Sequence, residues 1–209
     1  MAYGQVAVVK YTENIDKEWQ ADRDPDAIKM ALELRNAHPQ DSVDQLKNLA
    51  DLGSSLAMVY IGDAYANGRG LERDVNVGVN WYIRAADHGS TEAAHRLAFY
   101  HYHMKRFNDS IEILRRLSDQ GFSPATYCLG LFCYHGVGVE KSLPLAMKFW
   151  ELAASRGHLL AARKISFVLR SGVYGLLGVM KGIVKMFFLI IPYIRCSLDN
   201  PRSDRLREW

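Results

Sequence analysis

Apolar positions recur with a helical period along most of the chain, and glycines separate the helical segments. Four of these glycines, Gly53, Gly89, Gly121 and Gly157, each follow an apolar helical turn and lie 36, 32 and 36 residues apart. Glycine just past a last helical turn adopts the left-handed conformation at little cost. Self-similarity over about 30 to 40 residues indicates stacked helix pairs, each burying its apolar face on the next. The pattern therefore predicts an all-α protein, a short α-solenoid of stacked antiparallel helix pairs.

Further helices extend the array on both sides. Residues 26–37 and 41–52 carry apolar side chains at helical spacing, with Pro25 suited to a first helical position and Asp41 or Ser42 as an N-cap. In the short central unit, helices over 91–104 and 109–118 are joined by the turn 105–108, and 159–170 supplies a further first helix. We expect the repeat region to cover residues 23–172.

The two outer units align without a gap when the chain is shifted by 68 residues. The first unit carries an alanine, glycines, aromatic residues and a final glycine at Ala57, Gly62, Tyr65, Gly68, Gly70, Trp81, Tyr82, Ala85, Ala86 and Gly89. The second carries the same pattern at Ala125, Leu129, Gly130, Gly136, Gly138, Val139, Phe149, Trp150, Ala153, Ala154 and Gly157. These motifs resemble the Sel-one-like repeat family, a branch of the tetratricopeptide-like solenoids, and the resemblance implies a short right-handed α-solenoid. The central unit departs from the pattern, since it is four residues shorter and lacks the glycine pair.

The resemblance also implies that the first helices line a concave protein-binding surface. The candidate residues at these positions are mostly aromatic, histidine or charged. They are Asp63, Asn67, His95, Phe99, Tyr102, His103, Tyr127, Tyr134, His135, Arg163 and Arg170. Exposed aromatic side chains concentrate binding energy because they bury much area with little rotamer entropy to lose. The alternative for each ring is packing between helices.

Little in the sequence indicates catalysis. His101 and His103 project about 200° apart on a helix, so they cannot share a metal as residues i and i+4 do. The glycine pairs do not continue as phosphate-binding motifs, and His88 and His158 flank stop glycines, where histidine interacts favourably with a helix C-terminus. We expect no catalytic residues, metal site, cofactor, small-molecule substrate or nucleic-acid partner.

The resemblance therefore implies a non-enzymatic adaptor that binds a peptide or protein. Family members serve widely in bacteria as adaptors in signalling and in envelope or polysaccharide assembly. A hydrolytic enzyme stays open as an alternative, since a few cysteine-rich family members have been proposed to be enzymes.

Residues 173–194 form an apolar segment of 22 residues with two charges, Lys181 and Lys185. A span needs about 20 apolar residues, but the two lysines bring the insertion free energy close to zero. Because they lie four residues apart, they form a polar stripe that suits an interfacial helix. We expect membrane contact through Lys181, Lys185, Phe187 and Phe188. The alternatives are a single span, or a helix packed on protein.

Charge and cysteine usage bear on location. Residues 163–209 contain nine Lys or Arg and three Asp or Glu, whereas the whole chain has a net charge of +3. This basic end, which includes the tail 195–209, favours an anionic membrane face. Cys128 and Cys133 point about 140° apart on one helix, and no regular disulfide framework is present. We expect a reducing compartment and a cytoplasmic protein peripheral to the inner membrane. Residues 1–22 are an arm that does not resemble an export signal and could form a short strand.

Overall fold

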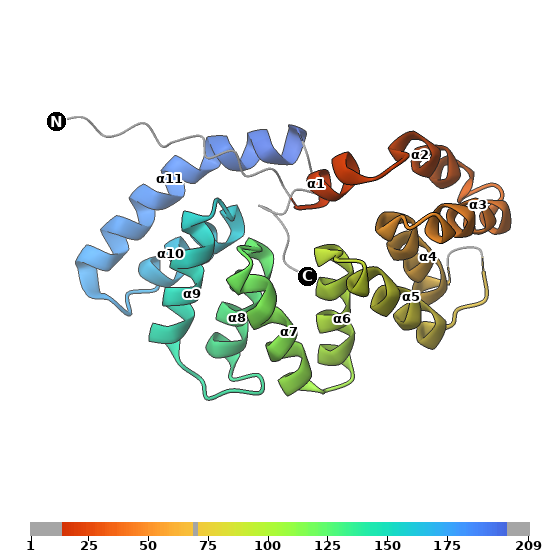
Figure 1. Cartoon of the computed structure of the whole chain (residues 1–209). Coiled ribbons are helices and arrows are strands. Elements are labelled where there is room, and N and C mark those ends of the chain that lie inside the picture. Colours follow the sequence, from red (N-terminus) through yellow and green to blue (C-terminus); the bar gives the residue numbers. More distant parts are fainter. Residues whose placement is uncertain (1–13, 69–70, 200–209) are drawn as a thin grey trace. The chain divides into compact units, whose positions relative to one another are not determined.

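The computed structural model describes residues 14–68 and 71–199, which form eleven α-helices (Figure 1). These residues fall into two compact units, 14–113 and 114–199, with the boundary inside one helix. The expected all-α architecture of paired helices is confirmed. The two units are described in turn.

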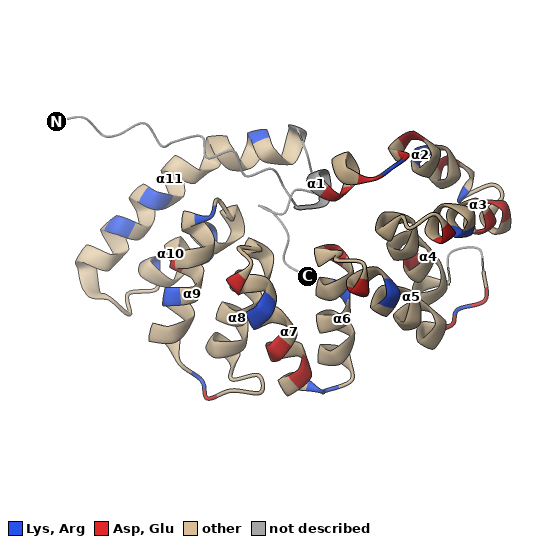
Figure 2. Ribbon diagram, viewed as in Figure 1, with Lys and Arg blue, Asp and Glu red and all other residues tan. Residues whose placement is uncertain are grey.

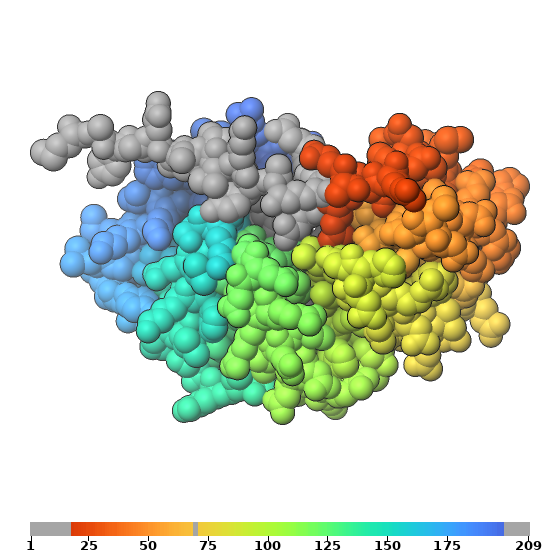
Figure 3. Space-filling view, viewed as in Figure 1, coloured from red at the N-terminus to blue at the C-terminus, as the bar shows by residue number. Residues whose placement is uncertain are grey.

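The first unit consists of six helices and the first half of a seventh. They are α1 (Asn14–Ala21), α2 (Pro25–Leu34), α3 (Pro39–Asp51), α4 (Ser55–Asn67), α5 (Val75–Asp87), α6 (Thr91–His103) and α7 (Phe107–Asp119). Successive helices from α2 to α6 pack on one another, and α1 packs on α6. Ile28, Leu46, Leu56 and Ile61 are fully buried and form the centre of the core. The space-filling view shows the helices α4 to α6 packed side by side (Figure 3).

Local capping explains where these helices begin. Asp24, Ser54, Asp74 and Ser90 are N-caps whose side chains each accept a bond from a backbone N–H three residues later. Pro25 is the first residue of α2, as predicted. The predicted N-cap of α3 at Asp41 or Ser42 is wrong. The helix begins at Pro39, because proline suits the first turn, and Ser42 is buried inside it.

The glycine period has the conformational basis that the sequence predicts. Gly53, Gly89, Gly121 and Gly157 have φ values of 95°, 87°, 92° and 87°, in the left-handed region that ends a helix. The central unit has a tighter connection in which Lys105 takes φ 57°. This turn replaces the glycine loop, and α7 begins at Phe107, two residues earlier than predicted.

The second unit contains the end of α7, then α8 (Ser123–His135), α9 (Leu143–Ser155), α10 (Leu159–Arg170) and α11 (Gly175–Asp199). The helices from α8 to α11 pack successively on one another. Trp150, Phe122, Leu114 and Ile165 are buried in its core. Gly130 on α8 lies directly against the Trp150 ring on α9, so a side chain there has no room.

The apolar segment forms the long helix α11, which extends to Asp199 rather than ending at Ile194. It packs closely on α10 through Gly178 and Gly182, and the Ser166 hydroxyl donates a hydrogen bond to the Gly182 carbonyl. The arm expected over residues 1–22 contains α1 from Asn14 onward; residues 1–13 and 200–209, including most of the basic tail, lie outside the described residues. All three cysteines, Cys128, Cys133 and Cys196, are buried, and none forms a disulfide.

Candidate functional site

The expected binding residues of the first unit lie on α4 and α6 with different degrees of exposure. Phe99, His103 and Asn67 are exposed, and Tyr102 is half-buried. His95 is only 4% exposed, because it shares the inner face of α6 with the fully buried Ala98. The expectation that His95 lines a binding surface is therefore wrong.

The C-terminal end of α6 carries an aromatic cluster made by Phe99, Tyr102, His103 and Phe107. The Phe99 and His103 rings meet edge to face with centroids 4.2 Å apart, and Tyr102 lies 5.4 Å from His103 and 5.9 Å from Phe107. Such contacts hold the rings in place without covering them. This cluster is a preformed, partly exposed aromatic surface.

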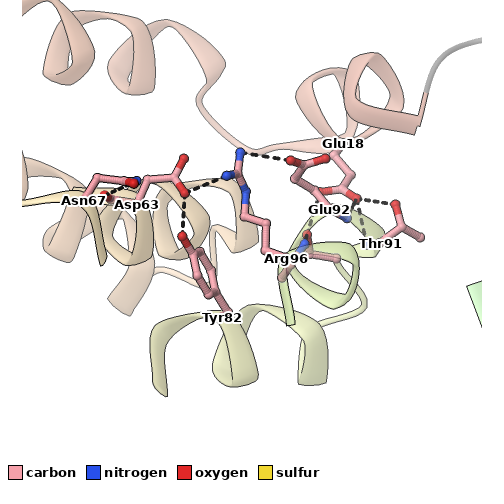
Figure 4. A network of polar contacts seen from close by, with 9 residues as sticks. Glu18, Asp63, Asn67, Tyr82, Thr91, Glu92 and Arg96 are labelled. Carbon is pink, nitrogen blue, oxygen red and sulfur yellow. Dashed lines mark hydrogen bonds and ion pairs between the residues drawn. The ribbon is translucent and has the colours of Figure 1, made fainter. Parts of the chain in front are cut away.

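Asp63, the remaining expected residue of this unit, belongs to a polar network around Arg96 (Figure 4). The Arg96 guanidinium contacts Asp63 Oδ1 at 2.8 Å and Glu92 Oε1 at 3.0 Å. The Tyr82 hydroxyl donates to Asp63 Oδ1 at 2.6 Å, and the Asn67 amide donates to the Asp63 carbonyl at 2.9 Å. Asp63 is thus engaged inside the unit, where it joins α4 to α5 and α6.

Burial and charge set the protonation states in this network. Burial by itself would lower the pKa of Arg96, but Asp63 and Glu92 more than offset this and raise it. Burial raises the pKa of Tyr82 well above its ordinary value, and the neighbouring Asp63 carboxylate raises it further. The network therefore holds a permanent cation and a neutral phenol, and its ion pairs and hydrogen bonds connect the helices of this unit.

Helix α1 is attached to the same region by two carboxylates. Glu18 accepts hydrogen bonds from the Ser90 hydroxyl at 2.8 Å, from the Thr91 amide at 2.8 Å and from the Thr91 hydroxyl at 2.7 Å. Asp22 accepts one from the Ser54 hydroxyl at 2.6 Å. Glu18 therefore places a negative charge at the N-terminus of α6, where the helix dipole favours it.

Sequence reasoning did not identify Glu18, Tyr82, Glu92 or Arg96 as a connected group. The alignment of the two outer units indicates this group, since under the shift of 68 residues Asp63 aligns with Leu131 and Glu92 aligns with Leu160. A polar residue in one unit where the other has leucine marks a position that needs a polar partner.

The second unit presents its expected residues on α8 and α10. His135, Arg163 and Arg170 are exposed, and Tyr134 is half-buried beside Trp150, with ring centroids 5.4 Å apart. Tyr127 is 3% exposed and stacks on His158 at 4.8 Å. The expectation that Tyr127 is available to a partner is therefore wrong, because its ring packs between helices.

His88 and His158, which lie beside the helix-ending glycines Gly89 and Gly157, differ in role. His88 Nδ1 lies 2.9 Å from the Arg84 carbonyl at the end of α5, in agreement with the prediction. His158 instead follows its glycine and caps the next helix, since its Nδ1 accepts from the Ala161 amide at 3.2 Å. The predicted helix C-terminal role of His158 is therefore wrong, and the residue takes the place of a serine N-cap.

Helix α11 has three different flanks at helical spacing. Gly178, Gly182, Met186 and Tyr193 share the flank that packs on α10. A second flank carries the exposed cations Lys181, Lys185 and Arg195, visible as separate blue segments in Figure 2.

The third flank of α11 is apolar and uncovered. Ile183, Phe187, Ile190 and Ile194 lie on it, at exposures of 45% to 73%, and Phe188 beside the cations is 77% exposed. The 24 residues Gly175–Leu198 are long and apolar enough to cross a membrane. Only 11% of their most apolar stretch of 18 residues is buried within the structure. An ordinary core helix would have this apolar surface covered.

A cleft of about 530 Å³ lies between α10 and the C-terminal half of α11. Among the described residues, its lining is apolar apart from Ser166, Tyr193 and three cations. The lining residues that matter below are Lys164, Phe167, Arg170, Ile190, Tyr193 and Ile194. Lys164 Nζ lies 5.2 Å from the centroid of Tyr134 and 5.8 Å from that of Trp150.

Few groups in the described part of the chain suit catalysis. In these residues no group of three His, Cys, Asp or Glu side chains is placed to hold a metal ion. Burial raises the pKa of the Cys133 thiol, so it is not a ready nucleophile. Burial, with Arg106 beside it, lowers the pKa of His101 despite Asp109 at 3.6 Å, so the charged imidazolium is disfavoured there.

Comparisons with known proteins agree with this architecture. The Sel1 repeat family matches residues 55–90, 91–104 and 123–158. A Sel1 repeat protein from Oxalobacter formigenes superimposes with a TM-score of 0.65 at 19% identity, over 76% of this chain and 70% of that one. Together with the helix pairs and glycine turns, these matches decide the family.

The chain is a Sel1-like repeat protein. Only the first helix of the central repeat is matched, as expected for a unit that has lost its glycine loop. Sel1-like repeats are a scaffold fold that is typically non-enzymatic and typically binds proteins.

Two curated relatives are much longer proteins. A putative sel1-like repeat-containing protein L21 of Acanthamoeba polyphaga mimivirus is 26% identical over 54% of this chain and 21% of its own length. The ERAD-associated E3 ubiquitin-protein ligase component HRD3 of Candida glabrata is 25% identical over 62% of this chain and 14% of its own length. The chain thus spans about a fifth or less of either relative.

Proposed function

We propose that this Sel1-like repeat protein is a non-enzymatic scaffold that binds a peptide or protein through its first helices and is held at the cytoplasmic face of a membrane by α11. The proposed binding of a partner rests on the aromatic cluster at the end of α6, where Phe99 is 39% exposed and His103 is exposed beside it. Ordered aromatic side chains at a surface contribute most of the free energy in many interfaces.

The relatives support a role in an assembly. The Candida glabrata relative is a component of a ubiquitin ligase, so similar repeats occur in a multi-protein machine. We propose an adaptor of the same general kind, in signalling or in envelope or polysaccharide assembly, with a protein or peptide as its partner.

Site-specific photo-crosslinking tests the binding half. A photoreactive amino acid replaces His103 in one version of the full chain and Glu112, an exposed residue of α7, in a control version. We expect one set of proteins to be captured at 103 and not at 112. Phe99→Ser should reduce capture at 103 at least fivefold while leaving the helical circular dichroism unchanged. Equal capture at both positions, or no effect of Phe99→Ser, would contradict the proposal.

The membrane half depends on α11, and its packing favours a position at the interface over a span. Gly182, near the middle of the helix, lies against the backbone of Ser166 and Arg170. A spanning α11 would therefore carry α10, with Lys164 and Arg170, into the hydrocarbon region, where each charge costs several kcal/mol. An interfacial α11 keeps these cations and its own lysines near headgroups.

Flotation and extraction distinguish these arrangements. The protein should float with anionic vesicles, and Phe187→Ser with Phe188→Ser should reduce flotation at least tenfold. Leu145→Ser with Leu152→Ser, which changes two exposed leucines of α9, is the matched control and should float normally. Cell membranes washed with alkaline carbonate should release the protein. Retention in the carbonate pellet would support the alternative, a single-span protein presenting the repeats to the cytoplasm.

A further inference from the structure

The cleft between α10 and α11 differs from the rest of the surface because it combines cations with an uncovered apolar wall. Phe167, Ile190 and Ile194 line it and are 54%, 45% and 53% exposed. Arg170 lies at the same cleft, where its guanidinium contacts the sulfur of Met186 at 2.8 Å. A volume of about 530 Å³ lies within the range of sites for small organic ligands.

The repeat register shows that Lys164 in this cleft lacks the two acidic counterparts that surround Arg96 in the first unit. Lys164 is the counterpart of Arg96 under the shift of 68 residues, and each lies over an aromatic ring of its unit. Arg96 is neutralised by Asp63 and Glu92. The counterparts of those two acids are Leu131 and Leu160, and among the described residues no acidic side chain lines the cleft.

The apolar wall indicates what kind of anion fits. Ile190 and Ile194 belong to the apolar flank of α11, so the cleft surface continues onto the flank that we propose faces the membrane. A soluble anion would leave this wall in contact with water, whereas a phospholipid supplies both a phosphate and an acyl chain. An acidic peptide would match the cations, but it carries no long hydrocarbon chain to cover the apolar flank that continues from the cleft.

We propose that the cleft binds one anionic phospholipid, with the headgroup phosphate on Arg170 and Lys164 and an acyl chain along Phe167, Ile190 and Ile194. This inference rests on the proposed membrane location of α11. It adds headgroup selectivity to an otherwise general attraction between a basic protein and an anionic surface. Arg170 contributes through its fork of donors, and Lys164 through its charge.

A photoreactive lipid tests this assignment on the full-length chain. Vesicles contain phosphatidylglycerol or phosphatidylcholine with a diazirine in one acyl chain, and peptide mass spectrometry locates the labelled residues. We expect phosphatidylglycerol to label residues 163–170 and 189–194 at least fivefold more than phosphatidylcholine. Arg170→Gln should remove that preference and Arg170→Lys should retain part of it. Lys148→Gln, an exposed cation of α9, should have no effect.

Three results would overturn the proposal. They are equal labelling by both lipids, a preference for phosphatidylglycerol that survives Arg170→Gln, and loss of labelling on adding millimolar inorganic phosphate, which would indicate a site for a soluble anion. Labelling by either lipid at Phe187 and Phe188 alone would show membrane contact without a lipid site.

A second measurement separates this proposal from the membrane proposal. If the protein does not float with vesicles, native mass spectrometry with dihexanoyl phosphatidylglycerol monomers decides. A one-to-one adduct that Arg170→Gln abolishes would support the cleft while the membrane location fails. Absence of that adduct would overturn the cleft as well.

Discussion

Gly62 and Gly130 occupy equivalent positions in two helix pairs and allow the helices of each pair to approach closely. A Cβ at Gly62 would lie 2.6 Å from the Tyr82 ring, and one at Gly130 would meet the Trp150 ring. The lack of a side chain is therefore matched to a large ring on the neighbouring helix. The close packing of each helix pair therefore requires glycine, which has no Cβ, at these two positions.

Gly130→Ala tests whether adding a methyl group at this position lowers or raises the free energy of unfolding. In an open helix, replacing glycine by alanine stabilises by about 0.5–1 kcal/mol. Here we expect a loss of about 1–3 kcal/mol, because the new methyl group displaces the Trp150 ring. Urea unfolding measures it. Combined with Trp150→Leu, the loss should be smaller than the sum of the two single losses; strict additivity would contradict the packing argument.

Arg96→Met should destabilise the first unit by about 1–3 kcal/mol, because it leaves Asp63 and Glu92 without their cation. Thermal and urea unfolding measure the change. The control is Lys29→Met, which removes an exposed pair with Asp26 and should cost less than about 1 kcal/mol. Equal effects of the two substitutions would show that the network adds nothing to an ordinary surface pair.

His101 should make stability depend on pH. Its pKa in the folded chain lies below the ordinary 6.5 because of burial and Arg106. At a pH between the folded and the unfolded pKa of His101, the unfolded chain binds more protons than the folded chain. The free energy of unfolding therefore falls as the pH decreases through this range. His101→Gln should flatten this slope below pH 7, measured by urea unfolding at a series of pH values. An unchanged slope would mean that another group dominates.

At the scale of elements, the connections between helices distinguish the repeats. Three units end on glycine in the left-handed region and then start a new helix from a capping residue, Ser54, Ser90 or His158. Inside the central unit, Lys105 has φ 57° where a non-glycine residue is strained. The shortened unit thus keeps its helix pair at a local conformational cost.

Lys105→Gly should stabilise the protein by about 0.5–1 kcal/mol, since glycine adopts this conformation without strain. The midpoint of urea unfolding is the measurement. Lys105→Ala removes the same side chain but keeps a Cβ, so it should give no gain. A gain of equal size in both variants would assign the effect to the lysine charge instead of the backbone.

For the whole molecule, charge and apolar surface gather toward the C-terminal end. Residues 163–209 carry a net charge of +6, while the chain as a whole carries +3. The exposed cations Lys181 and Lys185 lie beside the uncovered apolar flank of α11. This combination is the basis of the proposed membrane attachment.

Lys181→Gln with Lys185→Gln should weaken binding to anionic vesicles by about fivefold per lysine, from about 1 kcal/mol each, and reduce its salt dependence. Binding to zwitterionic vesicles should change little. Quantitative flotation at two salt concentrations measures both. Equal losses on the two kinds of vesicle would indicate that the lysines support folding instead of headgroup contact.

The sequence alone determined the features that depend on neighbouring residues. Helix ends at Gly53, Gly89, Gly121 and Gly157 could be predicted because a left-handed glycine and a cap are local, and the offset of 68 residues identified the repeat family. The extent of α10 was also predicted correctly. The N-cap of α3 was missed because several residues in a row could begin that helix.

Tertiary structure decided which side chains are exposed and which meet. His95 and Tyr127 had the same sequence signature as the exposed Phe99 and His135, but neighbouring helices cover the first two. Glu18 caps a helix more than 70 residues away, and the cleft beside Arg170 exists only because α11 folds back on α10. A helical period shows which residues share a face, but what covers that face depends on residues distant in the chain.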